Sequence, residues 1–253
     1  MTSIVIFGAG NLATHLFNAF LKAEKFKVIQ VYNHKPESLE FFKNKTKTTT
    51  NLTDVLPADI YLLALKDDVI QGLAQKVIYK KALVLHTSGA TPMSVFTNFE
   101  RFGVFYPLQT FSKNKAVDFK NIPLCIEANN EADLQLLEQL AREVSEKVYR
   151  ISSEQRKYLH VAAVFVSNFV NYLYTEGQVI CERNQIPFEI LHPLILETAT
   201  KIIDLSPKEA QTGPAKRNDL AVINSHLELL NEEQKKNYQI LTGSIQKLHG
   251  KEL

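Results

Sequence analysis

The sequence SIVIFGAGNLATHLFNAFLK, residues 3–22, joins an apolar run, two closely spaced glycines and an amphipathic segment. The apolar run at 3–7 predicts a strand that ends at Gly8. Apolar residues of the following segment recur at spacings of three and four, and these are Leu12, Ala13, Leu16, Phe17 and Phe20. This spacing predicts a helix over 12–24 with one buried face. Together the strand, the glycine turn and the helix predict the first unit of an α/β sheet.

The same alternation continues through the first half of the chain. Short apolar and β-branched runs predict further strands at 27–33, 59–65, 82–87, 103–108, 123–128 and 147–151. A second helical pattern covers 131–147, and the polar residues 43–51 predict a surface loop. Strands that alternate with helices are typical of a doubly wound, mostly parallel sheet with helices on both faces. We therefore expect an α/β domain over residues 1–152.

After Ser152 the strand patterns stop. Ser152 and Gln155 have the spacing of a capping box, which predicts the start of a helix. Helical patterns then cover 154–184, 187–204, 215–230 and 232–248. Residues 153–253 are thus predicted to form an all-helical second domain.

Composition narrows the class of protein. The chain has 253 residues, of which 45% are hydrophobic and 22% charged, which suits a globular protein with one or two cores. A net charge of +2 gives no strong field for nucleic acid or a membrane surface, and the apolar runs are too short to span a bilayer. Cys125 and Cys181 stand alone, so we expect free, buried thiols and no metal site. The N-terminus also lacks a secretory signal pattern. These features predict a cytoplasmic protein.

The glycines form the pattern Gly8-x-Gly10-x-x-Ala13 at a junction of strand and helix. In a dinucleotide fingerprint the first glycine permits a tight turn, the second lets a pyrophosphate approach, and the third position allows helix–strand packing. Backbone amides at the helix start then face the phosphates. The predicted cofactor-binding residues here are Gly8, Ala9, Gly10, Asn11 and Leu12. A tight turn that binds nothing is the alternative interpretation.

The end of the second predicted strand indicates which dinucleotide is bound. Sites for NAD usually carry a carboxylate there, which binds the ribose 2′-hydroxyl. This chain has Asn33, His34 and Lys35 instead, and these groups suit a 2′-phosphate. NADP(H) is therefore favoured over NAD(H), although Lys35 could also be a solvated turn residue.

The end of the strand predicted at 59–65 also carries candidate residues. Ala64, Leu65 and Lys66 lie at its carboxyl end and are predicted to contact the cofactor. Asp67 or Asp68 is expected to cap the next helix.

The loops at 85–92 and 105–112 supply further polar groups. Thr87 and Ser88 are predicted to contact the cofactor, with Ser88 also a catalytic candidate. His86 and Gln109 are candidates for substrate binding. Ordinary turn chemistry is the alternative for both loops.

The long helical pattern from 154 carries a line of polar residues. At about 100° per residue, His160, Ser167 and Asn171 fall within about 40° of one another, with Asn168 beside them. Because apolar residues cover most of the remaining circumference, the helix is predicted to be buried, and its polar groups need partners. They either bond a neighbouring helix or dimer mate, or face a cleft between domains. In the second case His160 transfers a proton, Asn168 holds substrate, and Ser167 and Asn171 line the site.

A last candidate pair lies at a junction of loop and helix. Pro214 suits the first turn of a helix, and Lys216 and Arg217 follow it. These cations could bind an anionic substrate, or they could simply be solvated.

Five stretches of the chain resemble a family of Rossmann-like proteins with a helical C-terminal domain of unknown function. They are FGAGNLATHL (7–16), HTSGA (86–90), FYPLQTFS (105–112), HVAAVFVSNFVNYL (160–173) and TGPAKRND (212–219). This family is similar in turn to pyrroline-5-carboxylate reductase, 6-phosphogluconate dehydrogenase-like enzymes and deazaflavin-dependent NADP oxidoreductases. The resemblance implies NADP binding, an oxidoreductase activity and a homodimer formed through C-terminal helices. The candidate residues themselves favour hydride transfer to or from a small, anionic metabolite in a cleft between the domains. It identifies neither the substrate nor whether a deazaflavin is the hydride partner.

One residue departs from the wider group. Its 3-hydroxyacid dehydrogenases carry a catalytic lysine four residues before a substrate-binding asparagine, whereas Val164 precedes Asn168 here. The resemblance therefore leaves His160 as a candidate proton donor. It also leaves open a non-catalytic dinucleotide-binding sensor or scaffold dimer.

Overall fold

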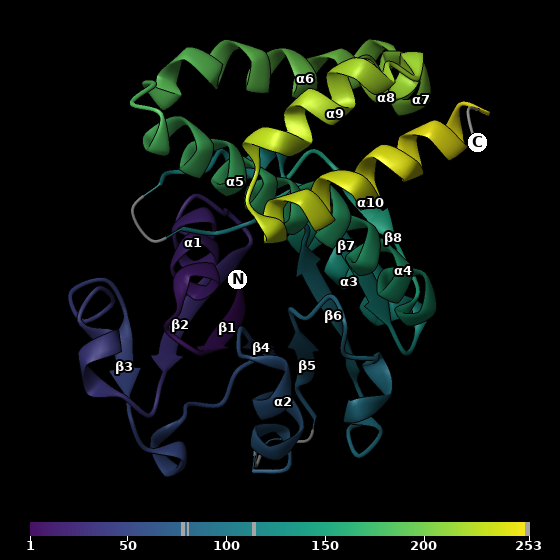
Figure 1. Cartoon of the computed structure of the whole chain (residues 1–253). Coiled ribbons are helices and arrows are strands. Elements are labelled where there is room, and N and C mark those ends of the chain that lie inside the picture. The colour runs from purple at the N-terminus through teal and green to yellow at the C-terminus, as the bar shows by residue number, and fades with distance from the viewer. Residues whose placement is uncertain (77–78, 80, 113–114, 251–253) are drawn as a thin grey trace. The chain divides into compact units, whose positions relative to one another are not determined.

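The computed structural model describes residues 1–76, 79, 81–112 and 115–250 (Figure 1). These residues form two compact units, Met1–Val164 and Phe165–Leu253.

In the described part of the first unit, eight strands form one sheet in the order β3-β2-β1-β4-β5-β6-β7-β8. The strands are β1 (Thr2–Phe7), β2 (Phe26–Tyr32), β3 (Lys47–Thr49), β4 (Ile60–Leu63), β5 (Leu83–His86), β6 (Phe102–Pro107), β7 (Leu124–Ala128) and β8 (Val148–Arg150). Neighbouring strands pair in parallel, except for β6 and β7, which are antiparallel. The mostly parallel, Rossmann-like sheet predicted from the sequence is confirmed.

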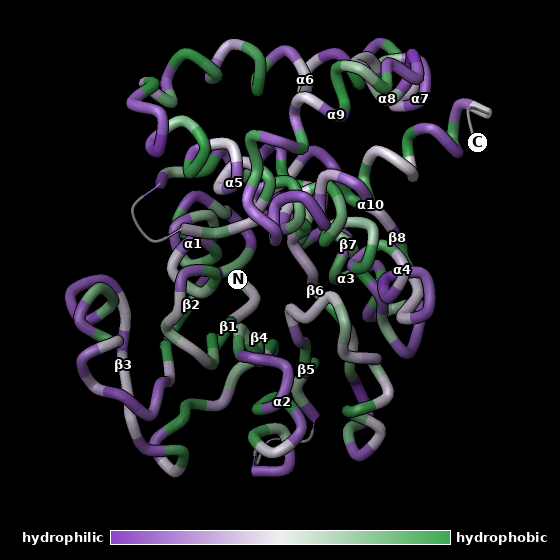
Figure 2. The backbone as a smooth tube through the Cα atoms, in the orientation of Figure 1, coloured by the Kyte–Doolittle hydropathy of each residue, from purple (hydrophilic) through white to green (hydrophobic). Residues whose placement is uncertain are grey.

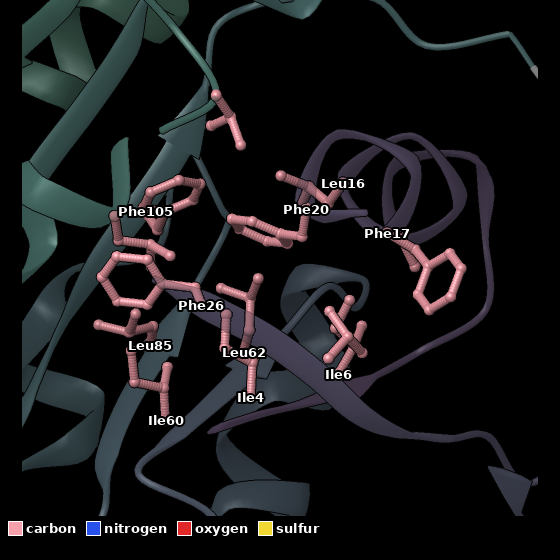
Figure 3. Packing of buried hydrophobic residues seen from close by; sticks show 14 of the residues in the cluster. Ile4, Ile6, Leu16, Phe17, Phe20, Phe26, Ile60, Leu62, Leu85 and Phe105 are labelled. Atoms are coloured by element: carbon pink, nitrogen blue, oxygen red, sulfur yellow. The ribbon is translucent and has the colours of Figure 1, made fainter. Parts of the chain in front are cut away.

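Alternate residues of the central strands build a core on each face of the sheet. One face packs Ile4, Ile6 and Leu62 against the helices α1 (Asn11–Phe20) and α3 (Glu131–Arg142). Figure 3 shows Leu16 and Phe20 of α1 over these strand residues. The other face packs the intervening strand residues against α2 (Asp67–Ala74). Hydrophobic residues therefore run along β1, β4 and β5, as Figure 2 shows, because a sheet covered on both faces is apolar throughout.

Short 3₁₀ turns connect these elements: η1 (Pro36–Leu39), η2 (Leu52–Asp54), η3 (Met93–Phe96) and η4 (Phe119–Asn121). The first unit ends with α4 (Ser153–Ala163). The predicted capping box is present, because Ser152 Oγ accepts from Gln155 N and Gln155 Oε1 accepts from Ser152 N.

The second unit is helical throughout its described residues. A π-helical segment, η5 (Val164–Phe169), joins α4 to α5 (Val170–Arg183) across the boundary of the units. The later elements are η6 (Phe188–Leu191), α6 (His192–Asp204), α7 (Pro207–Ala210), α8 (Pro214–Arg217), α9 (Leu220–Leu229) and α10 (Glu232–Leu248). The predicted change from strands to helices after Ser152 is thus confirmed.

Two local expectations were wrong. The predicted polar loop at 43–51 contains strand β3, which pairs with the end of β2 as an edge strand and is polar because only part of it is buried. Neither Asp67 nor Asp68 caps α2, because Lys66 is the N-cap residue and both aspartates lie in the first helical turn. There the negative charges of the aspartates interact favourably with the positive end of the helix dipole, although neither side chain makes a capping hydrogen bond.

None of the described helices is long and apolar enough to cross a membrane. Both cysteines are buried and free of disulfides. Among the described residues, no three metal-ligating side chains come together.

Candidate functional site

Four candidate segments follow the carboxyl ends of neighbouring parallel strands. Phe7 of β1 lies beside Tyr32 of β2 and Leu63 of β4, and Leu63 lies beside His86 of β5. The next residues of each strand therefore emerge together, and they are Gly8, Asn33, Ala64 and Thr87. The chain order also reverses between β1 and β4, which is the place where open parallel sheets bind ligands.

Gly8 and Gly10 differ in what surrounds them. Gly8 has φ +109°, and a Cβ there would lie 2.2 Å from the carbonyl oxygen of Ala64. Only glycine suits this turn, because other residues rarely adopt such a φ. Gly10 is exposed and precedes α1, and a Cβ there would have no atom within 4 Å. A ligand can thus approach the first amides of α1 over Gly10, as a dinucleotide phosphate requires.

The side chain of Asn11 is held by the backbone at Phe111. Its Nδ2 donates to the carbonyl oxygen of Phe111 at 3.0 Å. One turn later, His15 Nε2 lies 3.0 Å from the carbonyl oxygen of Ser112, and its ring packs on Phe111. Only the backbone of Asn11 thus remains for a phosphate, with half-buried Leu12 behind it.

A cleft of about 950 Å³ extends from the glycine turn along the outer face of α1. Its lining includes Ala9, Gly10 and Asn11 of the glycine turn, and Glu37 and Ser38 of η1. Open space therefore adjoins the glycine turn.

The end of β2 presents two free basic groups. Asn33 is nearly buried, and its Nδ2 donates to the carbonyl oxygen of Lys35 at 3.2 Å, which fixes the turn. The side chains of His34 and Lys35 are exposed and make no hydrogen bond or ion pair with any described residue. Both can therefore meet an anion at this edge.

At the end of β4, Ala64 and Leu65 are half-buried and Lys66 is exposed. Ala64 N donates to the carbonyl oxygen of Phe7, which ties this segment to β1. The backbone of these three residues thus lies beside the glycine turn, at the carboxyl ends of β1 and β4.

The loop after β5 is held by its own hydroxyl groups. Ser88 Oγ accepts from the amides of Ala90 and Thr91, at 3.1 and 2.9 Å. Thr87 Oγ1 donates to the carbonyl oxygen of Leu63 at 3.3 Å. Thr87 and Ser88 are both about 5% exposed, so their side chains chiefly fix the loop.

His86 is fully buried, which the sequence did not predict for a substrate-binding residue. Its Nδ1 accepts from Ser88 N at 3.2 Å and its ring packs on Phe96. Burial, with the nearby charge of Arg156, lowers the pKa of His86 to about 3, although the Pro92 carbonyl opposes this shift. His86 is therefore a neutral packing residue beneath the loop and does not reach a surface where substrate could bind.

Gly89, Tyr106 and His160 come together beside this loop. A Cβ at Gly89 would lie 2.6 Å from His160 Nδ1 and 2.8 Å from the Tyr106 hydroxyl. The hydroxyl and Nδ1 are 3.4 Å apart. Burial raises the pKa of Tyr106, with a smaller contribution from Cys125 and an opposing one from Arg156. A phenol and an imidazole, both capable of carrying a proton, thus flank the loop.

The sequence reasoning missed Tyr106 as a candidate and did not identify Arg156 at all. Tyr106 follows the β6 residue Val104, which lies beside His86, so strand order could have indicated it. Arg156 lies among other charged residues in the sequence, and only the structure shows that it is buried.

The polar line predicted on the long helix is interrupted. The π-helical segment Val164–Phe169 closes its hydrogen bonds over five residues instead of four, so ideal α-helical angles do not relate His160 to Asn171. In the second unit Ser167 is half-buried, while Asn168 and Asn171 are exposed.

The basic pair and Gln109 also differ in their surroundings. Lys216 Nζ donates to the carbonyl oxygen of Gln211 at 2.7 Å, and Arg217 is exposed. Gln109 is exposed, and its Oε1 accepts from Thr110 N at 2.8 Å. Arg217 is thus the freer cation of the pair.

The apolar part of the long helix is exposed, contrary to the predicted burial. Phe165 is 63% exposed and Val166 71% exposed, and Phe169 is about half exposed. These side chains are therefore not buried in the core of the second unit.

Comparison with known proteins agrees with this architecture. Residues 3–88 match the family described as NADP oxidoreductase coenzyme F420-dependent, and residues 122–245 match a domain of unknown function, DUF2520. No curated protein sequence matches the chain.

Solved structures add relatives over the whole length. A protein from Bacteroides fragilis, described as a "putative NADP oxidoreductase", is 42% identical, with 97% of this chain and 98% of that chain covered and a TM-score of 0.90. An imine reductase from Myxococcus stipitatus in complex with NADP⁺ is 13% identical, with coverage of 97% and 93% and a TM-score of 0.70. A 1-pyrroline-5-carboxylate reductase from Streptococcus pyogenes is 15% identical, with coverage of 98% and 98% and a TM-score of 0.61. The last two show the fold alone. The chain therefore belongs to the NADP oxidoreductase family of the Bacteroides fragilis protein, with a Rossmann-like N-terminal domain and a helical C-terminal domain, and its DUF2520 match spans the last two strands and most of the helices that follow.

Proposed function

We propose that the protein is an oxidoreductase that prefers NADP(H) to NAD(H) and acts on a small, anionic metabolite. The observation that carries the preference is the end of β2, where His34 and Lys35 are exposed and unpaired among the described residues. No carboxylate stands at 33–35 to repel a 2′-phosphate. The Myxococcus stipitatus structure with NADP⁺ supports a nicotinamide dinucleotide, but not the preference.

Different residues at the carboxyl ends of the strands contact different parts of the dinucleotide. The amides after Gly10 bind the pyrophosphate, and His34 and Lys35 bind the 2′-phosphate. Ala64, Leu65 and Lys66, with Thr87 and Ser88, support the nicotinamide half, because they end β4 and β5. NADP(H) supplies or accepts the hydride when it is bound.

His160 and Tyr106 carry the proton. Their side chains are 3.4 Å apart beside Gly89, so a proton given to substrate by one is replaced through the other. The Tyr106 hydroxyl is the neutral donor, because its pKa is raised by burial. Val164 supplies no ionisable group, which leaves this pair to do the work of a lysine.

Substrate recognition belongs to polar residues outside the glycine turn. Asn168 holds the substrate, and the supporting residues are Gln109, Ser167, Asn171, Lys216 and Arg217. The cations make an anionic substrate the better partner. The active protein is a cytoplasmic homodimer formed through the C-terminal helices, and the apolar side chains exposed there support this assembly.

The experiment that tests the proposal is a titration of the protein with NADPH and with NADH, followed by nicotinamide fluorescence. We expect NADPH to bind about tenfold more tightly or better, because a charge-assisted hydrogen bond contributes about 1.5–3 kcal/mol. Lys35→Ala should remove most of this difference. Lys27→Ala, at the other end of β2, is the matched control and should leave it unchanged.

The outcomes separate the alternatives. Equal affinity for both dinucleotides would contradict the preference, and failure to bind either would contradict the proposed function. Tight NADPH binding in a protein that oxidises or reduces no metabolite in a broad screen would favour a non-catalytic dinucleotide sensor.

A further inference from the structure

Arg156 carries a buried charge and is not one of the proposed cofactor-binding residues. Its side chain is 1% exposed and belongs to α4, whereas the glycine turn lies at the end of β1. A guanidinium stays charged when it is buried, so it needs a full set of hydrogen-bond acceptors. The partners that it finds show what it holds.

The guanidinium bridges the two ends of the loop after β5. Arg156 Nε donates to the carbonyl oxygen of Ser88 at 3.2 Å, and Nη2 donates to that of Thr91 at 2.6 Å. The Ser88 hydroxyl meanwhile accepts from the amides of Ala90 and Thr91. The turn 88–91 is therefore fixed from inside by Ser88 and from beneath by Arg156.

A carboxylate and a hydroxyl complete this arrangement. Arg156 Nη1 donates to Glu127 Oε2 at 2.8 Å, which balances the buried charge. Ser153 Oγ donates to the same carboxylate oxygen at 2.6 Å and accepts from Arg156 Nη2 and from Met93 N. The network thus ties β7, α4 and both sides of the loop together.

His160 lies one turn after Arg156 and meets the same loop. The two residues are four apart in α4, so they lie on the same side of the helix. His160 Nδ1 meets Gly89, at the centre of the loop that Arg156 holds. The loop that Arg156 holds is therefore the loop against which the imidazole of His160 lies.

We infer that Arg156, supported by Glu127 and Ser153, is a positioning residue for the nicotinamide half of the bound dinucleotide. The inference rests on the proposed function, in which the loop after β5 supports that half. The adenosine half lies at β1 and β2, which the network does not touch. Disturbing Arg156 should thus weaken one half of the cofactor site and spare the other.

The test compares NADPH with 2′,5′-ADP, which contains only the adenosine half. In Arg156→Lys the charge remains, but one ammonium cannot satisfy two carbonyls and Glu127 in the fork geometry of a guanidinium. We expect the Kd for NADPH to rise about tenfold, or about 1.4 kcal/mol, with a smaller fluorescence enhancement of the bound nicotinamide. The Kd for 2′,5′-ADP should change by less than about twofold. Arg150→Lys, which alters an exposed ion pair with Glu138, is the matched control and should change neither.

Each other outcome overturns the inference. An unchanged Kd and fluorescence for NADPH would show that Arg156 does not position the nicotinamide half. A parallel loss of both ligands would show general support of the fold. If the wild-type protein binds no NADPH, the proposed function fails first and the inference with it.

Ser153→Ala keeps the inference testable if Arg156→Lys does not fold. This change removes the hydroxyl that joins Met93, Glu127 and Arg156 but leaves the guanidinium in place. We expect a smaller loss of NADPH affinity with unchanged 2′,5′-ADP affinity. Unchanged NADPH affinity in this variant would again overturn the inference.

Discussion

Gly8 and Gly10 lie two residues apart, yet the structure gives them different physical purposes. Gly8 is required by the backbone, whereas Gly10 leaves room for a ligand. We predict that Gly8→Ala lowers the free energy of unfolding by at least about 2 kcal/mol, because its φ is positive and its Cβ would meet the Ala64 carbonyl. Urea unfolding without cofactor measures this change.

Gly10→Ala is the matched control for that prediction. Its φ of −80° suits alanine and its Cβ meets no atom, so the free energy of unfolding should fall only by the cost of alanine at the N-cap of α1, about 1 kcal/mol. The NADPH affinity should fall instead, because the methyl group occupies the space of the pyrophosphate. Equal unfolding curves for the two variants would contradict this division.

His86 makes stability depend on pH. The folded protein protonates this residue only near pH 3, whereas an unperturbed histidine protonates near 6.5. Below pH 6.5 the unfolded chain therefore binds a proton that the folded protein does not. We predict that the free energy of unfolding falls by about 1.4 kcal/mol per pH unit as the pH drops from 6.5 toward 3.

The control for this prediction is His86→Asn, in which an amide oxygen can still accept from Ser88 N but nothing titrates. Urea unfolding at pH 7.0, 6.0 and 5.0, about the range in which a histidine titrates, should show a steeper loss for the wild type than for the variant. Parallel pH profiles would contradict the low pKa of His86.

The residues of the site differ in how far the sequence could predict them. The turn at Gly8 was predictable because its pattern is local and physically restrictive. Arg156 and Tyr106 were not, because their importance comes from carbonyls and side chains far away in sequence. His86 was placed on the correct strand end, but burial of its ring depends on packing against Phe96.

Among the secondary structure elements, α4 depends on its capping box for a defined start. Ser152→Ala removes the bond from Gln155 N to the serine hydroxyl, so we predict a loss of about 1 kcal/mol in the free energy of unfolding. Chemical denaturation of the whole chain measures this loss. Ser244→Ala in the interior of α10 is the same change without a cap and should cost nothing. Equal effects of the two changes would exclude the cap as the cause.

Physical reasons also explain why some elements could be predicted from the sequence and others could not. The apolar strands β1, β4 and β5 are evident because both of their faces are buried. Strand β3 is not, because Lys47 and the threonines after it form a short, half-exposed edge. The long helix was predicted as regular, since the π-helical hydrogen bonding of Val164–Phe169 leaves no mark in the apolar pattern.

For the whole molecule, the proposed dimer would use the exposed apolar side chains of the second unit. Phe165, Val166 and Phe169 are each more than half exposed, and the two phenylalanine rings pack edge to face on each other. Contiguous apolar surface of this kind is usually covered by a partner. Since the proposed partner is a second copy, the same surface must be buried twice in one symmetric interface.

We therefore predict that the purified protein sediments as a dimer and that Val166→Asp shifts it toward the monomer. The change places a charge where the apolar side chain is 71% exposed, so it should leave the fold of the single chain intact and destabilise only the interface. Leu21→Asp is the matched control, because Leu21 is 58% exposed but follows α1 in the first unit. Sedimentation velocity across a range of protein concentrations separates the cases. A wild-type monomer, or a Val166→Asp variant that dimerises as well as Leu21→Asp, would exclude this surface as the dimer interface.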